Sequence, residues 1–75
     1  MLELNPKDNE QLMGGSCPTC GKSTFLHGPK GGNDENIRCE QCGSEFWFSP
    51  PFRAMRLERD NPELYHESFD LRSCI

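Results

Sequence analysis

Four of the five cysteines form two pairs with the same spacing. Cys17 and Cys20 make the first pair, Cys39 and Cys42 make the second, and glycine follows each pair directly. The segment between the pairs has a length typical of four-cysteine metal sites, which follow the pattern C-x2-C-x15–20-C-x2-C. Four thiolates in a tetrahedral arrangement favour zinc, with iron as the minor alternative. The spacing therefore predicts one zinc ion per chain, held by these four side chains.

Gly21 and Gly43 occupy equivalent places after the two pairs. In a metal-binding turn this position needs a positive φ, so that backbone N–H groups can point at the thiolates, and glycine adopts such a φ without steric cost. A thioredoxin-type redox site would instead use one C-x-x-C at the start of a helix in a βαβ setting. No such setting surrounds Cys17, so we expect two metal-binding turns with positive φ at both glycines.

The size of the chain also favours a metal. It has 75 residues, only 33% of them hydrophobic, and a chain this short rarely folds on its apolar core alone. The first residues lack the basic and apolar regions of a signal peptide, and no stretch is long enough to span a membrane. We therefore expect a cytoplasmic protein, in which thiols stay reduced and disulfides are disfavoured. Cys74 is expected to be a free thiol and not a ligand.

Short strands must position the two cysteine pairs. Residues 23–27 are predicted as a strand, residues 28–32 as a turn, and residues 36–38 as the return to the second pair. The aromatic segment 45–48 is predicted as a further strand. We therefore expect about three short antiparallel strands, with a hairpin between the two pairs.

Two C-x-x-C-G knuckles, a hairpin between them and a strand after the second resemble a zinc ribbon of the rubredoxin-like group, over roughly residues 15–49. The string C-P-x-C-G…F-L-x-G-P-x-G-G…N-I-x-C-x-x-C-G-x-x-F is similar to small single-ribbon proteins of phages and bacteria. This resemblance implies a phage- or prophage-encoded, metal-stabilised domain in the cytoplasm of a bacterial host. It implies no activity, because zinc ribbons serve many unrelated functions.

The segments outside the ribbon are shorter and less patterned. Residues 1–14 are expected to be a flexible N-terminal segment, and residues 50–75 a tail that starts with two prolines. We predict a short helix over residues 52–59. A second helical segment is predicted from Asn61, a favoured N-cap with proline after it, to about Leu71. This helical tail is expected either to pack on the ribbon or to dock on a partner.

No catalytic motif accompanies the cysteines. His27 and His66 lie outside the metalloprotease and deaminase motifs. A closed shell of four thiolates also leaves no coordination position for water, which makes such zinc structural. We therefore predict that the protein is not an enzyme.

The charge distribution favours a protein partner. The net charge is −4, and residues 60–75 alone carry −3, whereas non-specific nucleic-acid binding depends on neutralising phosphates. We predict a non-catalytic interaction or regulatory module that acts on a protein, such as part of a transcription or nucleic-acid machine. The candidate partner-binding residues are Lys30, Trp47, Phe48, Phe52, Arg53 and Arg56.

A nucleic-acid-binding regulator is the alternative function. Arg53, Arg56 and Arg59 recur every three residues, which would place them on one face of the predicted helix. Aromatic side chains beside them could stack on the bases of mRNA or single-stranded DNA. The knuckles are also similar to those of the short-ribbon translational regulator of Mu-like prophages.

Overall fold

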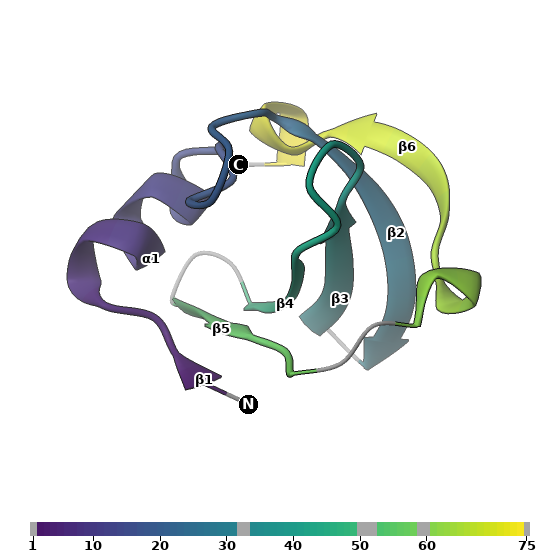
Figure 1. The fold of residues 1–75 in the computed structure, drawn as a ribbon, viewed down its shortest axis with the longest axis horizontal. Coiled ribbons are helices and arrows are strands. Elements are labelled where there is room, and N and C mark those ends of the chain that lie inside the picture. The colour runs from purple at the N-terminus through teal and green to yellow at the C-terminus, as the bar shows by residue number, and fades with distance from the viewer. Residues whose placement is uncertain (1, 32–33, 50–52, 59–60, 75) are drawn as a thin grey trace.

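A computed structural model describes residues 2–31, 34–49, 53–58 and 61–74. Six strands form one antiparallel sheet in the order β1-β5-β4-β3-β2-β6, accompanied by one α-helix in the described part of the chain (Figure 1). The elements are β1 (Leu2–Glu3), α1 (Pro6–Met13), β2 (Thr24–Gly31), β3 (Asp34–Cys39), β4 (Glu45–Ser49), β5 (Arg53–Arg56), the 3₁₀ turn η1 (Pro62–Leu64), β6 (His66–Asp70) and the 3₁₀ turn η2 (Leu71–Cys74). No described helix has the length and apolar character needed to cross a bilayer.

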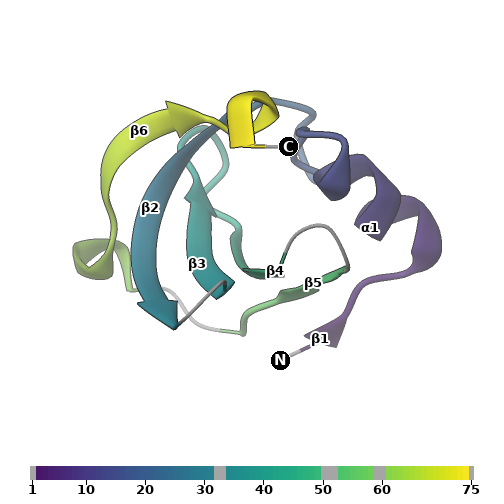
Figure 2. The same cartoon turned by 180° about the vertical axis from the view of Figure 1, so that it is seen from behind.

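The sheet curves around a small core (Figure 1, Figure 2). Helix α1 closes the open side of the curve next to β1, and η2 lies next to the start of β2, where the Leu71 N–H donates to the Ser23 carbonyl at 2.9 Å. Each of these two elements contributes one fully buried leucine, Leu12 from α1 and Leu71 from η2. The strands supply the rest of the core, namely Phe25, Ile37, Phe46, Phe48 and Ala54, together with Cys17 and Cys39.

The predicted hairpin between the cysteine pairs is confirmed, and its strands are longer than expected. Strand β2 pairs with β3 in a register that sets Phe25 opposite Cys39 and Gly31 opposite Asp34. The turn predicted at residues 28–32 was wrong, because β2 continues to Gly31. A register shift between His27 and Lys30 accommodates the glycine and proline there. Such bulges absorb residues that suit regular pairing poorly.

The aromatic strand predicted at residues 45–48 is confirmed as β4. Successive side chains on a strand point to opposite faces. Phe46 and Phe48 are buried in the core, while Trp47 lies on the other face and is partly exposed. Ile37 on β3 lies directly opposite Phe46, which joins the two central strands in the core.

The predicted helical tail was wrong, since the described residues of the tail form two strands and two short 3₁₀ turns. Strand β5 pairs with β4, and β6 pairs with β2. Without these partners, β2 and β4 would each have one edge of unpaired backbone N–H and C=O groups. Pairing with β6 and β5 supplies the hydrogen-bond partners of these groups. The turn that begins after Asn61 has only three residues, and the Asn61 side chain makes no capping hydrogen bond. Long-range pairing thus overrides the local helical signals.

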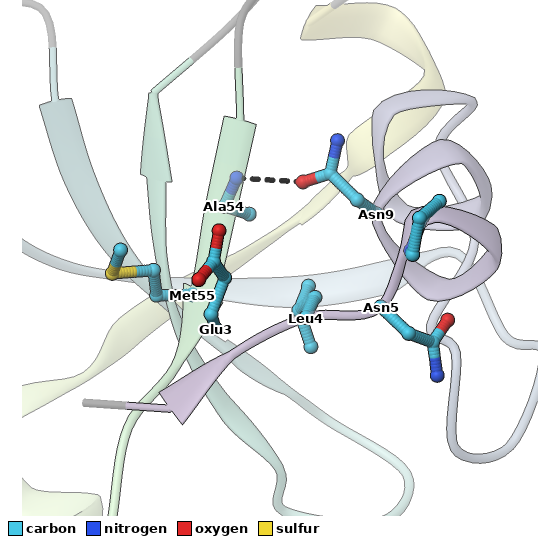
Figure 3. A pocket seen from close by; sticks show the side chains of 7 residues that line it. Glu3, Leu4, Asn5, Asn9, Ala54 and Met55 are labelled. Atoms are coloured by element: carbon cyan, nitrogen blue, oxygen red, sulfur yellow. Dashed lines mark hydrogen bonds between the residues drawn. The ribbon is translucent and has the colours of Figure 1, made fainter.

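The N-terminal segment, expected to be flexible, contains α1. Asn5 caps the helix, because its side-chain oxygen accepts a hydrogen bond from the Asp8 N–H at 2.8 Å. Asn9 reaches from the helix to the sheet and accepts a bond from the Ala54 N–H at 2.9 Å (Figure 3). Beyond the end of β1, the Asn9 side chain supplies the hydrogen bond that a paired strand would otherwise supply to β5. The helix therefore also protects part of the edge of β5.

Candidate metal centre

The four predicted ligands lie together. Their sulfur atoms are all within 4.8 Å of one another. The closest pairs join the two turns, with 3.6 Å between the sulfurs of Cys17 and Cys42 and 3.5 Å between those of Cys20 and Cys39. A disulfide would require about 2.05 Å, whereas tetrahedral zinc with bonds of about 2.3 Å sets its sulfurs roughly 3.8 Å apart. The four thiols are therefore positioned to bind a metal ion.

The two cysteine turns have the same backbone geometry. In each, the N–H of the first cysteine donates to the carbonyl five residues later, and the glycine N–H donates back to the first cysteine. These bonds run from Cys17 N to Lys22 O (2.7 Å), Gly21 N to Cys17 O (2.7 Å), Cys39 N to Ser44 O (2.8 Å) and Gly43 N to Cys39 O (2.9 Å). Both glycines have φ of 80°, as predicted. This left-handed conformation strains other residues and suits glycine.

Backbone N–H groups point at the first sulfur of each turn. Cys17 Sγ accepts from the N–H groups of Thr19 and Cys20, and Cys39 Sγ accepts from those of Gln41 and Cys42. Such bonds favour the ionised form of a thiol, which is the form that binds metal. The turns are thus arranged to stabilise thiolates.

Adjacent elements fix the positions of the turns. The first turn connects α1 to β2, and the second connects β3 to β4. Cys17 and Cys39 are fully buried in the core, whereas Cys20 and Cys42 are exposed. The Gln11 side chain also donates a hydrogen bond from α1 to the Cys17 carbonyl at 3.1 Å. The centre is therefore half embedded in the core and half open to solvent.

In the metal-free protein, the surroundings of the thiols raise the pKa of two of them and lower the pKa of a third. Burial raises the pKa of Cys17, and it raises the pKa of Cys39 to about 12. Burial also acts to raise the pKa of Cys42, but hydrogen bonds from the side chain and backbone of Ser44, with smaller contributions from Cys17 and Cys39, bring it down to about 7. At pH 8 the first two thiols therefore keep their protons and Cys42 is mostly ionised.

Metal affinity should consequently rise with pH. A metal must displace the protons of Cys17 and Cys39 at any pH below 9, and below pH 7 it must also displace that of Cys42. Each displaced proton corresponds to a change in apparent affinity of about 10-fold per pH unit, so the affinity should change by at least about 100-fold per unit above pH 7 and more steeply below it. Chelator competition at pH 6, 7 and 8 measures this dependence. An affinity that stays constant over this range would contradict the assignment of protonated thiols.

The other predicted site residues do not gather in one place. Lys30 is exposed on β2 and Trp47 is partly exposed on β4, whereas Phe48 is only 3% exposed and belongs to the core. Phe52 lies outside the described residues, as does the side chain of Arg53. A partner can contact Lys30 and Trp47 directly, but Phe48 can reach one only if the core opens.

The helix that was expected to carry the basic stripe is wrong. Arg53 and Arg56 belong to strand β5, so helical spacing does not apply to them. Arg59, the third member, lies outside the described residues. Arg56 instead contacts the metal-binding turns: its Nη2 lies 3.1 Å from Thr19 Oγ1, and its Nη1 lies 3.4 Å from Ser44 Oγ.

A buried carboxylate is the main feature that sequence reasoning missed. Glu45 is 2% exposed and forms a 2.8 Å ion pair with Arg38. It also accepts hydrogen bonds from the Tyr65 hydroxyl at 2.7 Å and the Asn61 N–H at 2.9 Å. These contacts join β4 and the second cysteine turn to the tail. A weak signal existed, since Arg38 and Glu45 flank the second cysteine pair and oppose each other across the hairpin.

His27 is not close to the metal centre. Its Nδ1 lies 2.7 Å from Glu35 Oε2, and its ring stacks on Phe69 with centroids 3.9 Å apart. Glu35 comes from β3 and Phe69 from β6. The histidine therefore joins three neighbouring strands.

Two surface hollows are lined by described residues. One, of about 250 Å³, includes both Lys30 and Trp47; it is lined by Pro29, Lys30, Gly31, Asp34, Glu35, Asn36 and Trp47. The other, of about 430 Å³, lies between β5 and the β1–α1 segment and is shown in Figure 3; it is lined by Glu3, Leu4, Asn5, Pro6, Asn9, Ala54 and Met55. The smaller hollow contains two predicted partner-binding residues, and the larger contains none.

The chemistry that the centre offers is that of a closed ligand set. Four thiolates fill a tetrahedral shell and leave no position for water or substrate.

Comparison of the chain with known proteins finds no matching family model, no matching curated protein and no matching solved structure.

Proposed function

We propose that the protein is a zinc-ribbon domain whose single zinc ion is structural. The sulfur separations, the two equivalent turns and the N–H groups directed at Cys17 and Cys39 support this assignment. Soft thiolate ligands in tetrahedral geometry bind zinc or iron. Elemental analysis of the purified protein distinguishes the two, with one zinc per chain as the expected result and a coloured iron protein as the contrary one.

We further propose that the domain is a non-catalytic interaction module that binds a protein partner. The hollow that includes Lys30 and Trp47 carries this proposal. Its aromatic wall and its volume of about 250 Å³ suit a single partner side chain, and aromatic anchors in small pockets dominate the energetics of many interfaces. Neither Lys30 nor Asp34 pairs with another described residue, so both charges are available to a partner.

The charges favour a protein over a nucleic acid. The net charge is −4, and zinc with four thiolates would add about −2 at the centre. Arg56, which was expected to contact phosphates, is hydrogen-bonded to Thr19 and Ser44 instead. The resemblance to phage and bacterial single-ribbon proteins supports a phage- or prophage-encoded module in a bacterial cytoplasm. A component of a transcription or nucleic-acid machine is the proposed class of partner.

Truncation of the aromatic wall should weaken partner capture. We expect Trp47→Ala to weaken binding by about 2 kcal/mol, or roughly 30-fold, because the aromatic surface that packs against the partner side chain is lost. Affinity capture from cells that carry the gene, with the wild-type and variant proteins side by side, tests this. Zinc content should stay at one per chain in both proteins.

The matched control is Leu64→Ala, which truncates a side chain on η1 that is 39% exposed and does not line the hollow. Capture should survive this change and depend weakly on salt. Equal capture by the Trp47→Ala variant and the wild type would exclude the hollow as the binding site. Retention of single-stranded RNA or DNA, with an affinity that falls steeply as salt rises, would support the nucleic-acid alternative.

A further inference from the structure

A hydrogen-bonded network connects the two cysteine turns on their solvent side. Arg56 contacts Thr19 of the first turn at 3.1 Å and Ser44 of the second at 3.4 Å. The two hydroxyls are themselves 3.3 Å apart. Ser44 Oγ also lies 3.2 Å from the sulfur of Cys42, one of the predicted ligands. A strand outside the predicted ribbon thus contributes a cation next to the metal centre.

The arginine is held in this position by the core. Its guanidinium carbon lies 5.0 Å from the centroid of the Phe46 ring, a distance at which cation–π attraction acts. Arg56 also pairs with Phe46 across strands β4 and β5, and with Leu2 across β1 and β5. Ring and backbone together direct the guanidinium toward the turns, so the contact is built by the fold.

No described carboxylate neutralises Arg56. The other arginine close to the second turn, Arg38, forms an ion pair with the buried Glu45. The charge of Arg56 therefore stays uncompensated in the described part of the chain. A zinc ion with four thiolates carries a net charge of about −2, and a guanidinium stays protonated at any physiological pH.

We propose that Arg56 is a positioning residue of the metal centre, which ties the two cysteine turns together and compensates the charge of the metal-loaded cluster. It acts through the hydroxyls of Thr19 and Ser44, and the Ser44 hydroxyl donates to the Cys42 sulfur when that sulfur is a thiolate. The consequence is slower loss of the metal. This inference rests on the proposed zinc assignment.

Zinc retention in the Arg56→Met variant tests the inference. Methionine keeps an apolar side chain against the Phe46 ring and removes the charge and the donors. Loss of outer-shell partners typically lowers metal affinity by about 10-fold to 100-fold, so we expect a change of that size in competition with a chromophoric chelator. Zinc should also transfer to the chelator faster by a similar factor. Arg56→Lys, which keeps the charge but not the planar fork, should fall in between.

The control is Lys7→Met, which removes one positive charge from an exposed position on α1. Its zinc affinity should stay within about twofold of the wild type, because Lys7 is in the first turn of α1, whereas the first cysteine turn follows the other end of that helix, and salt screens exposed charges. Equal retention by the Arg56→Met and Lys7→Met variants would overturn the inference. A wild-type protein that binds no zinc would instead refute the assignment on which it rests, so the two failures are distinguishable.

Cobalt substitution separates an electrostatic role from a purely structural one. Removing a cation near the sulfurs should move the thiolate-to-cobalt charge-transfer band to lower energy in the Arg56→Met variant, whereas loosening of the fold alone would not. Should that variant fail to fold, Thr19→Val with Ser44→Ala removes the bridging hydroxyls and keeps the arginine. That double variant should lose zinc several-fold faster than the wild type, and unchanged retention in it would overturn the inference.

Discussion

Removal of the metal should unfold the protein. Zinc binding to small structural sites supplies about 10–16 kcal/mol at neutral pH, which exceeds the total stability of most domains. The chain has few other resources, since its core is small and two of the core residues, Cys17 and Cys39, are themselves ligands. A strong chelator, or the Cys39→Ser variant, should collapse the dispersed amide spectrum of residues 17–48.

The variant Cys74→Ser is the control for this result. The four clustered cysteines can complete a tetrahedral shell by themselves, so replacement of Cys74, which we predict to be a free thiol, should leave one zinc per chain and an unchanged spectrum. A chelated, metal-free protein that keeps its dispersed amide signals would refute a structural role for the metal. Loss of zinc from the Cys74→Ser variant would instead show that the ligand set is wrong.

Replacement of Glu45 should cause the largest loss of stability outside the metal centre. The Glu45 side chain is fully buried, and its partner Arg38 is only 17% exposed. Removing one member of a buried ion pair costs about 3–5 kcal/mol, because the other charge is left without compensation. The Tyr65 hydroxyl would lose its acceptor as well. Denaturant unfolding of zinc-loaded Glu45→Ala should show this loss directly.

Two further variants define the origin of that effect. Tyr65→Phe removes one hydrogen bond to the carboxylate and should cost about 1.5–3 kcal/mol, as other bonds to charged groups do. Asp70→Asn changes an exposed carboxylate paired with Arg72 and should have little effect. If Glu45→Ala proved as mild as Asp70→Asn, the buried network would not be the connection that holds the tail on the sheet.

The parts of the fold that sequence could predict depend on local rules. Cysteine spacing and the glycines after each pair identify the two turns, because the ligand geometry and the positive φ are set within a few residues. The strand β4 is recognisable from its aromatic segment, because strand preference is also a property of neighbouring residues. Sequence alone does not show which face of that strand is buried. The register with Ile37 places Phe46 and Phe48 in the core, and this pairing comes from a different segment of the chain.

The tail was predicted incorrectly because its structure depends on distant partners. Asn61 and the proline after it are good helix-start signals, yet only a three-residue turn follows them. Pairing with β2 and the contact of Tyr65 with Glu45 determine the conformation beyond it. Helix α1 shows the opposite case, since Asn5 and Pro6 are equally good start signals and a helix does follow them. Its single fully buried residue, Leu12, makes the amphipathic pattern weak.

The strand order has a consequence for folding during synthesis. Strand β6 is translated after all the others, yet it pairs only with β2, which is translated early. One edge of β2 must therefore stay unpaired while the intervening chain is made, and exposed strand edges promote aggregation. All four predicted ligands precede β5 in the chain. Metal binding would then hold the two cysteine turns together in the intermediate until β6 pairs with β2.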